Sequence, residues 1–249
     1  MTEEPYRWVE AIANRREYIE NQLALGSPIA CVSCADGVLL LTVSRERQKL
    51  FEIYDRIAMG AIGHPGDIER LRMNAIEVAS AEGFNRSSHD VTLRRLAAYS
   101  LSPLLKNAFE QIYGPPFLAR MLYAELGKKG EPDLLLRMDY DGSFDTNGGT
   151  PASSLEPFAV ISGKSHSARM MEQFLRGKNT TRLSGAEALP VVLEAWIIGH
   201  YALTNEDRGF PSPEEVAAHR REHLREEMLE AALLDRHTRS QSTYRIFKV

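Results

Sequence analysis

Apolar residues recur along the chain with helical and strand periods, and the first such pattern lies in residues 5–24. Its apolar side chains are spaced three, four and seven apart among charged residues: Trp8, Val9, Ile12, Ile19 and Leu23. This spacing predicts an amphipathic helix. Pro5 suits the first helical turn, and Gly26 and Pro28 predict the end of the helix.

Short apolar runs follow and predict paired strands. Residues 29–34 and 38–43 flank Asp36-Gly37, and an Asp-Gly pair between β-prone runs is typical of a hairpin with a two-residue turn. Residues 50–55 and 57–63 repeat the pattern. The chain is therefore expected to open with a helix and then about four strands.

The remaining patterns group strands apart from helices. Helices are predicted at 65–83, 90–114 (bent at Pro103), 167–177, 184–203 and 213–230, and strands at 117–126, 133–144, 156–163 and in the last residues. Capping boxes at Ser184 and Ser212 start two of the helices. This grouping favours an α+β layered fold over an alternating βαβ one, and we expect one domain spanning 1–249.

Composition excludes several classes of function. The 249 residues are 43% apolar and 26% charged, as in ordinary globular proteins, and the formal charge of −4 shows no basic excess for binding nucleic acid. We find no apolar run of bilayer length, and the acidic start of the chain is unlike a secretory signal. We therefore expect a cytoplasmic protein with no membrane or nucleic-acid partner.

Cys31 and Cys34 form a C-x-x-C pair, but they lie in a predicted strand. Positions three apart on a strand point to opposite faces, whereas a redox pair needs both sulfurs together at a helix start. We interpret them as two small buried residues. No dinucleotide-binding or phosphate-binding glycine motif occurs, and no cofactor is expected.

Residues 219–223, "HRREH", match the H-x-x-E-H zinc-peptidase pattern, with His219 and His223 as metal ligands and Glu222 as the base. The surrounding segment is densely charged, and no third ligand stands out. We interpret it as a solvated helix face, with a zinc protein as an alternative.

Ser27 begins a predicted strand and has 26 residues ahead of it. N-terminal-nucleophile hydrolases use the first residue of a strand as the attacking group and its α-amine as the base, after a leader segment is removed. Ser27 is therefore a candidate nucleophile if the chain is cleaved before it.

Three segments carry a resemblance to a known family. They are the hairpin "IACVSCADGVLLLTV" after the N-terminal helix, the stretch "RQKLFEIYDRIAMGAIGHPGDIERLRMNAIEVASAEGF" (47–84), and the strand pair "LYAELG…DLLLRMDYDGSF" (122–144). The chain resembles an α-type proteasome subunit of the actinobacterial kind, most clearly over residues 8–144. The second segment is the most specific.

The resemblance implies a four-layer αββα sandwich of the N-terminal-nucleophile hydrolase type with an added N-terminal helix. It also implies seven-membered rings that cap catalytic β-rings, control substrate access and dock an AAA-type ATPase. The apolar face of the N-terminal helix would pack against neighbouring subunits and against its own sheet layer. A gating segment would be only Met1 to Glu4, and the helix at 213–230 would be an addition to the family pattern.

Family catalytic positions map onto Ser27, Lys49 and Val43. Lys49 matches the lysine that activates the nucleophile, Ser27 replaces a threonine, and Val43 stands where an acid is expected. Another departure is His64, which stands where relatives carry a lysine that binds the C-terminal carboxylate of the ATPase. A histidine holds a carboxylate only while protonated, which predicts weaker or pH-dependent docking.

Our main hypothesis is a non-catalytic α-type ring subunit in which Ser27 is buried behind a retained helix. Its expected partners are copies of itself, a catalytic β-subunit and an AAA-type ATPase. The alternatives are a self-processing peptidase that uses Ser27, a zinc protein and a proteasome-like scaffold without a β-partner.

Overall fold

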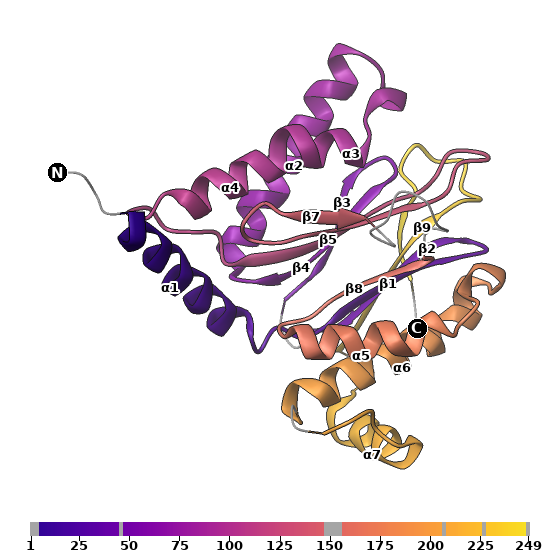
Figure 1. The fold of residues 1–249 in the computed structure, drawn as a ribbon. Helices are drawn as coiled ribbons and strands as arrows, with labels where there is room; N and C mark the ends of the chain where they lie inside the picture. Colours follow the sequence, from indigo (N-terminus) through magenta and orange to yellow (C-terminus); the bar gives the residue numbers. More distant parts are fainter. Residues whose placement is uncertain (1–4, 45–46, 147–155, 206–207, 226–227, 248–249) are drawn as a thin grey trace.

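Two antiparallel five-stranded sheets lie face to face between two layers of helices (Figure 1). The computed structural model describes residues 5–247 except 45–46, 147–155, 206–207 and 226–227. The first sheet has the order β10-β9-β2-β1-β8 and the second the order β3-β4-β5-β6-β7. The first sheet consists of β1 (Ile29–Cys34), β2 (Gly37–Val43), β8 (Phe158–Ile161), β9 (Leu229–Asp235) and β10 (Tyr244–Ile246), and the second of β3 (Leu50–Tyr54), β4 (Ile57–Gly63), β5 (Ala119–Glu125), β6 (Leu134–Met138) and β7 (Phe144–Thr146).

Helices cover the outer face of each sheet (Figure 1). The second sheet carries α2 (Pro65–Asn85), α3 (Leu93–Leu96) and α4 (Ser102–Glu110), and the first sheet carries α5 (Ser165–Arg176) and α6 (Gly185–Thr204). Two more helices lie at the margins: α1 (Pro5–Leu23) beside one end of the sandwich and α7 (Pro213–His223) against α6. The order of layers is the αββα arrangement that the sequence analysis expected.

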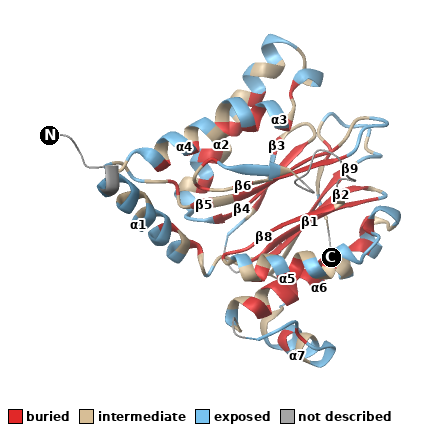
Figure 2. Ribbon diagram, in the orientation of Figure 1, coloured by how far each residue is buried: buried red, intermediate tan, exposed pale blue. Residues whose placement is uncertain are grey.

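Three apolar cores hold the layers together, and burial follows them (Figure 2). One core joins α2–α4 to the second sheet, one joins α5 and α6 to the first sheet, and the third lies between the sheets. All residues of β1 and β2 are buried, because the first sheet is covered on both faces.

The first hairpin confirms the two predicted strands but shifts the turn by one residue. Cys34 pairs with Gly37, so the loop is Ala35–Asp36 and Gly37 belongs to β2. Gly37 has φ +144°, and a Cβ there would lie 1.9 Å from the carbonyl oxygen of Leu234 in β9. The glycine is therefore required by the neighbouring strand.

The helix predicted at 90–114 is interrupted. It contains α3, a π-helical turn at Ala97–Leu101 and then α4, which begins at Ser102 and ends at Glu110. Pro103 sits in the first turn of α4, where its missing N–H costs little. The predicted bend is thus a change of helix type directly before the proline.

The helix predicted at 213–230 ends at His223, and Leu229 begins strand β9. Residues 229–230 were assigned wrongly. All seven residues of β9 pair with β2, from Leu229 opposite Val43 to Asp235 opposite Gly37. This long-range pairing outweighs the local preference of leucine and alanine for helix.

Helix α6 is, within the described part of the chain, the one helix long and apolar enough to cross a membrane by length and composition. No apolar run of bilayer length was predicted from the sequence. Here α6 packs on β1, β2 and α5, and Trp196 Nε1 donates a hydrogen bond of 2.9 Å to the carbonyl of Pro28. Its apolar character is that of a core helix.

Candidate functional site

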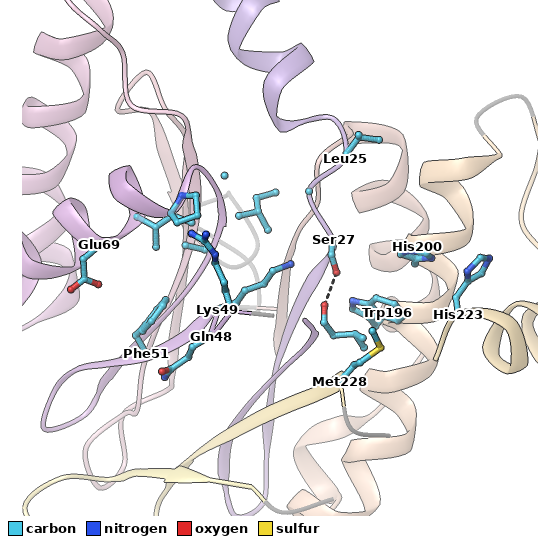
Figure 3. A pocket seen from close by; sticks show the side chains of 18 residues that line it. Leu25, Ser27, Gln48, Lys49, Phe51, Glu69, Trp196, His200, His223 and Met228 are labelled. Carbon is cyan, nitrogen blue, oxygen red and sulfur yellow. Dashed lines mark hydrogen bonds between the residues drawn. The ribbon is translucent and has the colours of Figure 1, made fainter. Parts of the chain in front are cut away.

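A pocket of about 630 Å³ lies where β1 begins, β2 ends and β3 begins (Figure 3). Ser27, Val43 and Lys49 all line it, so the fold brings together the three positions that the family resemblance had suggested. Helix α6 supplies Trp196 and His200 on the opposite wall.

Ser27 is half-buried and faces this pocket, so the expectation that it would be buried behind the N-terminal helix is wrong. Its hydroxyl donates a 3.0 Å hydrogen bond to the carbonyl of Val43. The helix ends four residues earlier and approaches from the side, which leaves the Ser27 side chain open to the pocket.

The segment ahead of Ser27 is held closely against the body. The amide of Gly26 donates to Leu23 O at 2.7 Å, and the amide of Gly163 donates to Gly26 O at 3.1 Å. A Cβ on Gly163 would lie 2.4 Å from Leu23 O. The nitrogen of Ser27 is part of a peptide bond in this packed segment and supplies no α-amine.

Helix α1 is anchored by its second half. Ile19 and Leu23 are buried in a small core with Phe109 and Tyr140. Arg15 donates hydrogen bonds of 2.9 and 2.8 Å to the carbonyls of Ala108 and Gly114, at and just beyond the end of α4. These contacts satisfy helix-end carbonyls of α4 and fix α1 beside the sandwich.

The first half of α1 is exposed. Trp8 is 45% and Val9 61% exposed, whereas Ile12 packs partly against the small core below it. The predicted apolar face is therefore divided: Ile19 and Leu23 pack within this chain, and Trp8 and Val9 lie free on its surface.

Lys49 extends from the start of β3 toward Ser27 (Figure 3). Desolvation in the pocket lowers the pKa of its amine to about 8, and the charge of Glu230 opposes this shift. The Glu230 carboxylate itself accepts hydrogen bonds from the backbone amides of Lys49 (2.9 Å) and Leu50 (2.8 Å). Burial raises the pKa of Glu230, and these two amides oppose that rise.

Ser27, Lys49 and Val43 thus give an incomplete set of groups for acyl transfer. A hydroxyl and a lysine amine are present, but Val43 offers a carbonyl instead of a carboxylate, and the α-amine is absent. Self-activation in this family of folds needs that amine as the base.

The zinc pattern folds into a histidine contact between α6 and α7. His219 is buried, so this helix face is not fully solvated as expected. Its Nε2 lies 2.8 Å from Nδ1 of His200, and its ring lies 4.2 Å from that of His223. Burial, aided by His223, lowers the pKa of His219 to about 4. Over the described ranges, no three His, Cys, Asp or Glu side chains are arranged to hold a metal ion.

The cysteine interpretation is confirmed. Cys31 belongs to the core between the sheets, and Cys34 belongs to the core under α5 and α6, so they point to opposite faces. Both are buried free thiols, and burial raises the pKa of each.

His64 caps α2 and is exposed at the junction with β4. Its amide donates to Leu118 O at 2.7 Å, and a Cβ on the preceding Gly63 would lie 2.0 Å from the same oxygen. The junction therefore holds His64 at the surface in a fixed place. The gating segment Met1 to Glu4 lies outside the described residues.

Sequence reasoning placed Ser27, Val43 and Lys49 but missed the far wall of the pocket. Trp196 and His200 are one helical turn apart on α6, and Met228 precedes β9. The four-residue spacing showed that Trp196 and His200 share a helix face, but nothing local showed that this face lines the same pocket as Lys49.

Comparison with known proteins gives the family. The family model "Proteasome subunit" matches residues 24–180. The chain is 29% identical to the proteasome subunit alpha of Kineococcus radiotolerans, over 95% of this chain and 90% of that protein. It is 31% identical to that of Geodermatophilus obscurus (95% of this chain, 75% of that protein) and 34% identical to that of Paenarthrobacter aurescens (75% and 74%).

The two stacked sheets between helices, the added α1 and these relatives agree: the chain belongs to the proteasome subunit family, and its relatives are α subunits from actinobacteria.

Proposed function

We propose that this chain is a non-catalytic α-type subunit of a proteasome core particle, forming an outer ring that controls access of proteins to a catalytic β-ring in the cytoplasm. One observation carries the proposal. Helix α1 is tied to the body through Leu23, Gly26 and Gly163, so Ser27 has no free amine. The missing acid at Val43 supports it, as do the α-subunit relatives.

Ring packing would use the exposed half of α1. Trp8 and Val9 offer apolar surface at a helix end that is not covered by this chain. Apolar side chains at the centre of an interface contribute most of the association energy. In the ring, seven copies would bury these side chains against their neighbours, while Ile19 and Leu23 hold each helix on its own sandwich.

Native mass spectrometry of the purified chain tests ring formation. The proposal predicts a seven-copy species of full-length subunits, alone or together with an actinobacterial β-subunit. Trp8→Glu should shift the population toward monomer, whereas Ile246→Glu, at a more exposed apolar site near the other end of the chain, should not. Full-length monomers in the presence of the β-subunit would favour a scaffold without that partner and refute the ring.

Docking of an AAA-type ATPase would involve His64. The side chain is exposed at a fixed junction, and an imidazole binds a terminal carboxylate strongly only when it is charged. A lysine at this position carries a charged ammonium at neutral pH and would bind the carboxylate without first taking up a proton. His64→Lys should therefore tighten binding of ATPase C-terminal peptides several-fold at pH 7.5. Unchanged affinity by fluorescence anisotropy would rule out this role.

A self-processing peptidase remains the second candidate, because the fold places Ser27 and Lys49 in one pocket. It requires removal of α1 together with residues 24–26. Subunits that begin at Ser27 would establish this candidate and overturn the first.

A further inference from the structure

The pocket that holds Lys49 is left without a role by the proposed ring function. We propose that it is a small-molecule and modification site in which the amine of Lys49 condenses with a small aldehyde that carries an anionic group. The inference goes beyond the ring function and does not depend on it.

The geometry leaves the lysine amine available. Lys49 is half-buried in a pocket of about 630 Å³ that is large enough for a ligand of metabolite size. Its Nζ makes no hydrogen bond or ion pair with any residue that the structure describes. The nearest acid, Glu230, uses its carboxylate on the backbone amides of Lys49 and Leu50 instead.

The state of the amine favours this chemistry. Only a neutral amine attacks a carbonyl carbon, and desolvation holds the pKa of Lys49 at about 8 against the usual 10.5. Roughly a quarter of the side chain is then neutral at pH 7.5, compared with roughly a thousandth for an ordinary lysine. Lysines activated by desolvation are typical of sites that form imines.

The walls select the kind of aldehyde. Arg47 lines the pocket beside Lys49, whereas Glu69, the one acid among the described lining residues, forms 2.7 Å hydrogen bonds with Arg72. This charge arrangement favours an anion. Phe51 and Trp196 add aromatic surface for a flat apolar body (Figure 3).

The reaction balances without a further reagent. The Lys49 nitrogen bonds to the aldehyde carbon, and the carbonyl oxygen leaves as water with the two hydrogens of the amine. The product is a neutral imine that water reverses. Borohydride then adds hydride to the imine carbon, and water supplies a proton to the nitrogen, which makes the bond permanent.

Several titratable groups surround Lys49, and among them the charge of Glu230 acts on its pKa. They come from every neighbouring element: Arg47 on its own loop, Glu230 on β9, Glu69 on α2, His200 on α6 and His223 on α7. Because the charge of Glu230 opposes the shift, Glu230→Gln should lower the pKa of Lys49 further and move the pH profile of labelling to lower pH.

The test uses pyridoxal 5′-phosphate as the probe, followed by borohydride and peptide mapping by mass spectrometry. The full-length chain has six other lysines: Lys106, Lys128, Lys129, Lys164, Lys178 and Lys248. At pH 7.5 and limiting probe, Lys49 should be labelled about tenfold faster than any of them. Pyridoxal, which lacks the phosphate, should label Lys49 several-fold more slowly.

Lys49→Arg should remove the fast labelling by the probe. Lys106→Arg, which changes an exposed lysine paired with Glu110, should leave that fast labelling unchanged. Mapping of the unaltered chain decides the question even if Lys49→Arg does not fold. Labelling spread evenly over all seven lysines would overturn the proposal. Equal labelling by pyridoxal would overturn its anionic part. Neither labelling result bears on ring formation, which native mass spectrometry measures separately.

Discussion

Helices α1 and α7 both lie outside the layered sandwich, but they are attached to it in opposite ways (Figure 1). Helix α1 is held by buried apolar side chains, Ile19 and Leu23, and by hydrogen bonds from Arg15 to carbonyls at and just beyond the end of α4. Helix α7 has one buried residue, His219, which contacts His200, and it is further held by the partly buried Val216 and by a 3.0 Å hydrogen bond that Tyr201 donates to Glu215.

The two attachments differ in how strongly they depend on pH. Apolar burial changes little with pH, whereas an imidazole contact is lost when the buried ring takes up a proton. We infer that α1 is a permanent part of the fold and that α7 is held more weakly, on α6.

The largest expected effect is a difference in stability loss when one apolar side chain is truncated in each helix. Leu23→Ala should lower the free energy of unfolding by about 2–5 kcal/mol, because Leu23 is fully buried. Val216→Ala in α7 should cost only about 1 kcal/mol, because Val216 is partly exposed. Urea denaturation of both variants measures the difference. Equal losses would contradict the contrast.

The second effect is a pH dependence confined to α7. Burial lowers the pKa of His219 to about 4, below its unfolded value near 6.5. The detached helix therefore binds a proton that the packed helix does not, so attachment is strongest above pH 6.5 and weakens as pH falls toward 4. Between pH 7 and 5 we expect a loss of about 1–2 kcal/mol in α7 alone.

Hydrogen exchange, corrected for its intrinsic pH dependence, measures this loss at pH 7 and 5. Protection should fall in α7 and stay constant in α1. His219→Gln should abolish the change, and His237→Gln, at an exposed site, should preserve it. An equal fall of protection in α1 would refute the assignment to His219.

The smallest effect concerns the start of α7. The Ser212 hydroxyl accepts from the amide of Glu215 at 3.3 Å, and the Glu215 carboxylate accepts from the amide of Ser212 at 2.8 Å. Loss of such a cap costs about 0.5–1 kcal/mol. Ser212→Ala should raise exchange in the first turn of α7, whereas Ser212→Asp keeps the cap and should not. No change in Ser212→Ala would mean that packing alone sets the end of the helix.

Local signals predicted most elements of the fold. The periodicity of residues 5–24 gave α1, whose bounds in the structure are Pro5–Leu23, and the capping boxes placed the starts of α6 and α7. The element that sequence reasoning missed, β9, has helix-forming residues and becomes a strand because the whole of β2 pairs with it. Pairing of residues nearly 200 positions apart leaves no local pattern.

Part of the candidate site could likewise be predicted from the sequence, and part could not. The family resemblance identified Ser27, Lys49 and Val43, and the structure places all three in one pocket. Gly37 has a positive φ of +144°, and the close approach of Leu234 O in β9 is a second requirement for glycine that the local sequence does not show. The histidine motif was understood only when α6 supplied His200, a partner that the spacing of residues 219–223 does not contain.

The intact mass of the subunit, measured after co-expression and incubation with an actinobacterial β-subunit, tests the central claim most directly. If α1 is a permanent part of the fold, every copy retains residues 5–26 and the mass stays that of the full-length chain, apart from any loss of the initiator methionine. A species that begins at Ser27, and that disappears in Ser27→Ala, would show that α1 is a removable leader and would contradict the account.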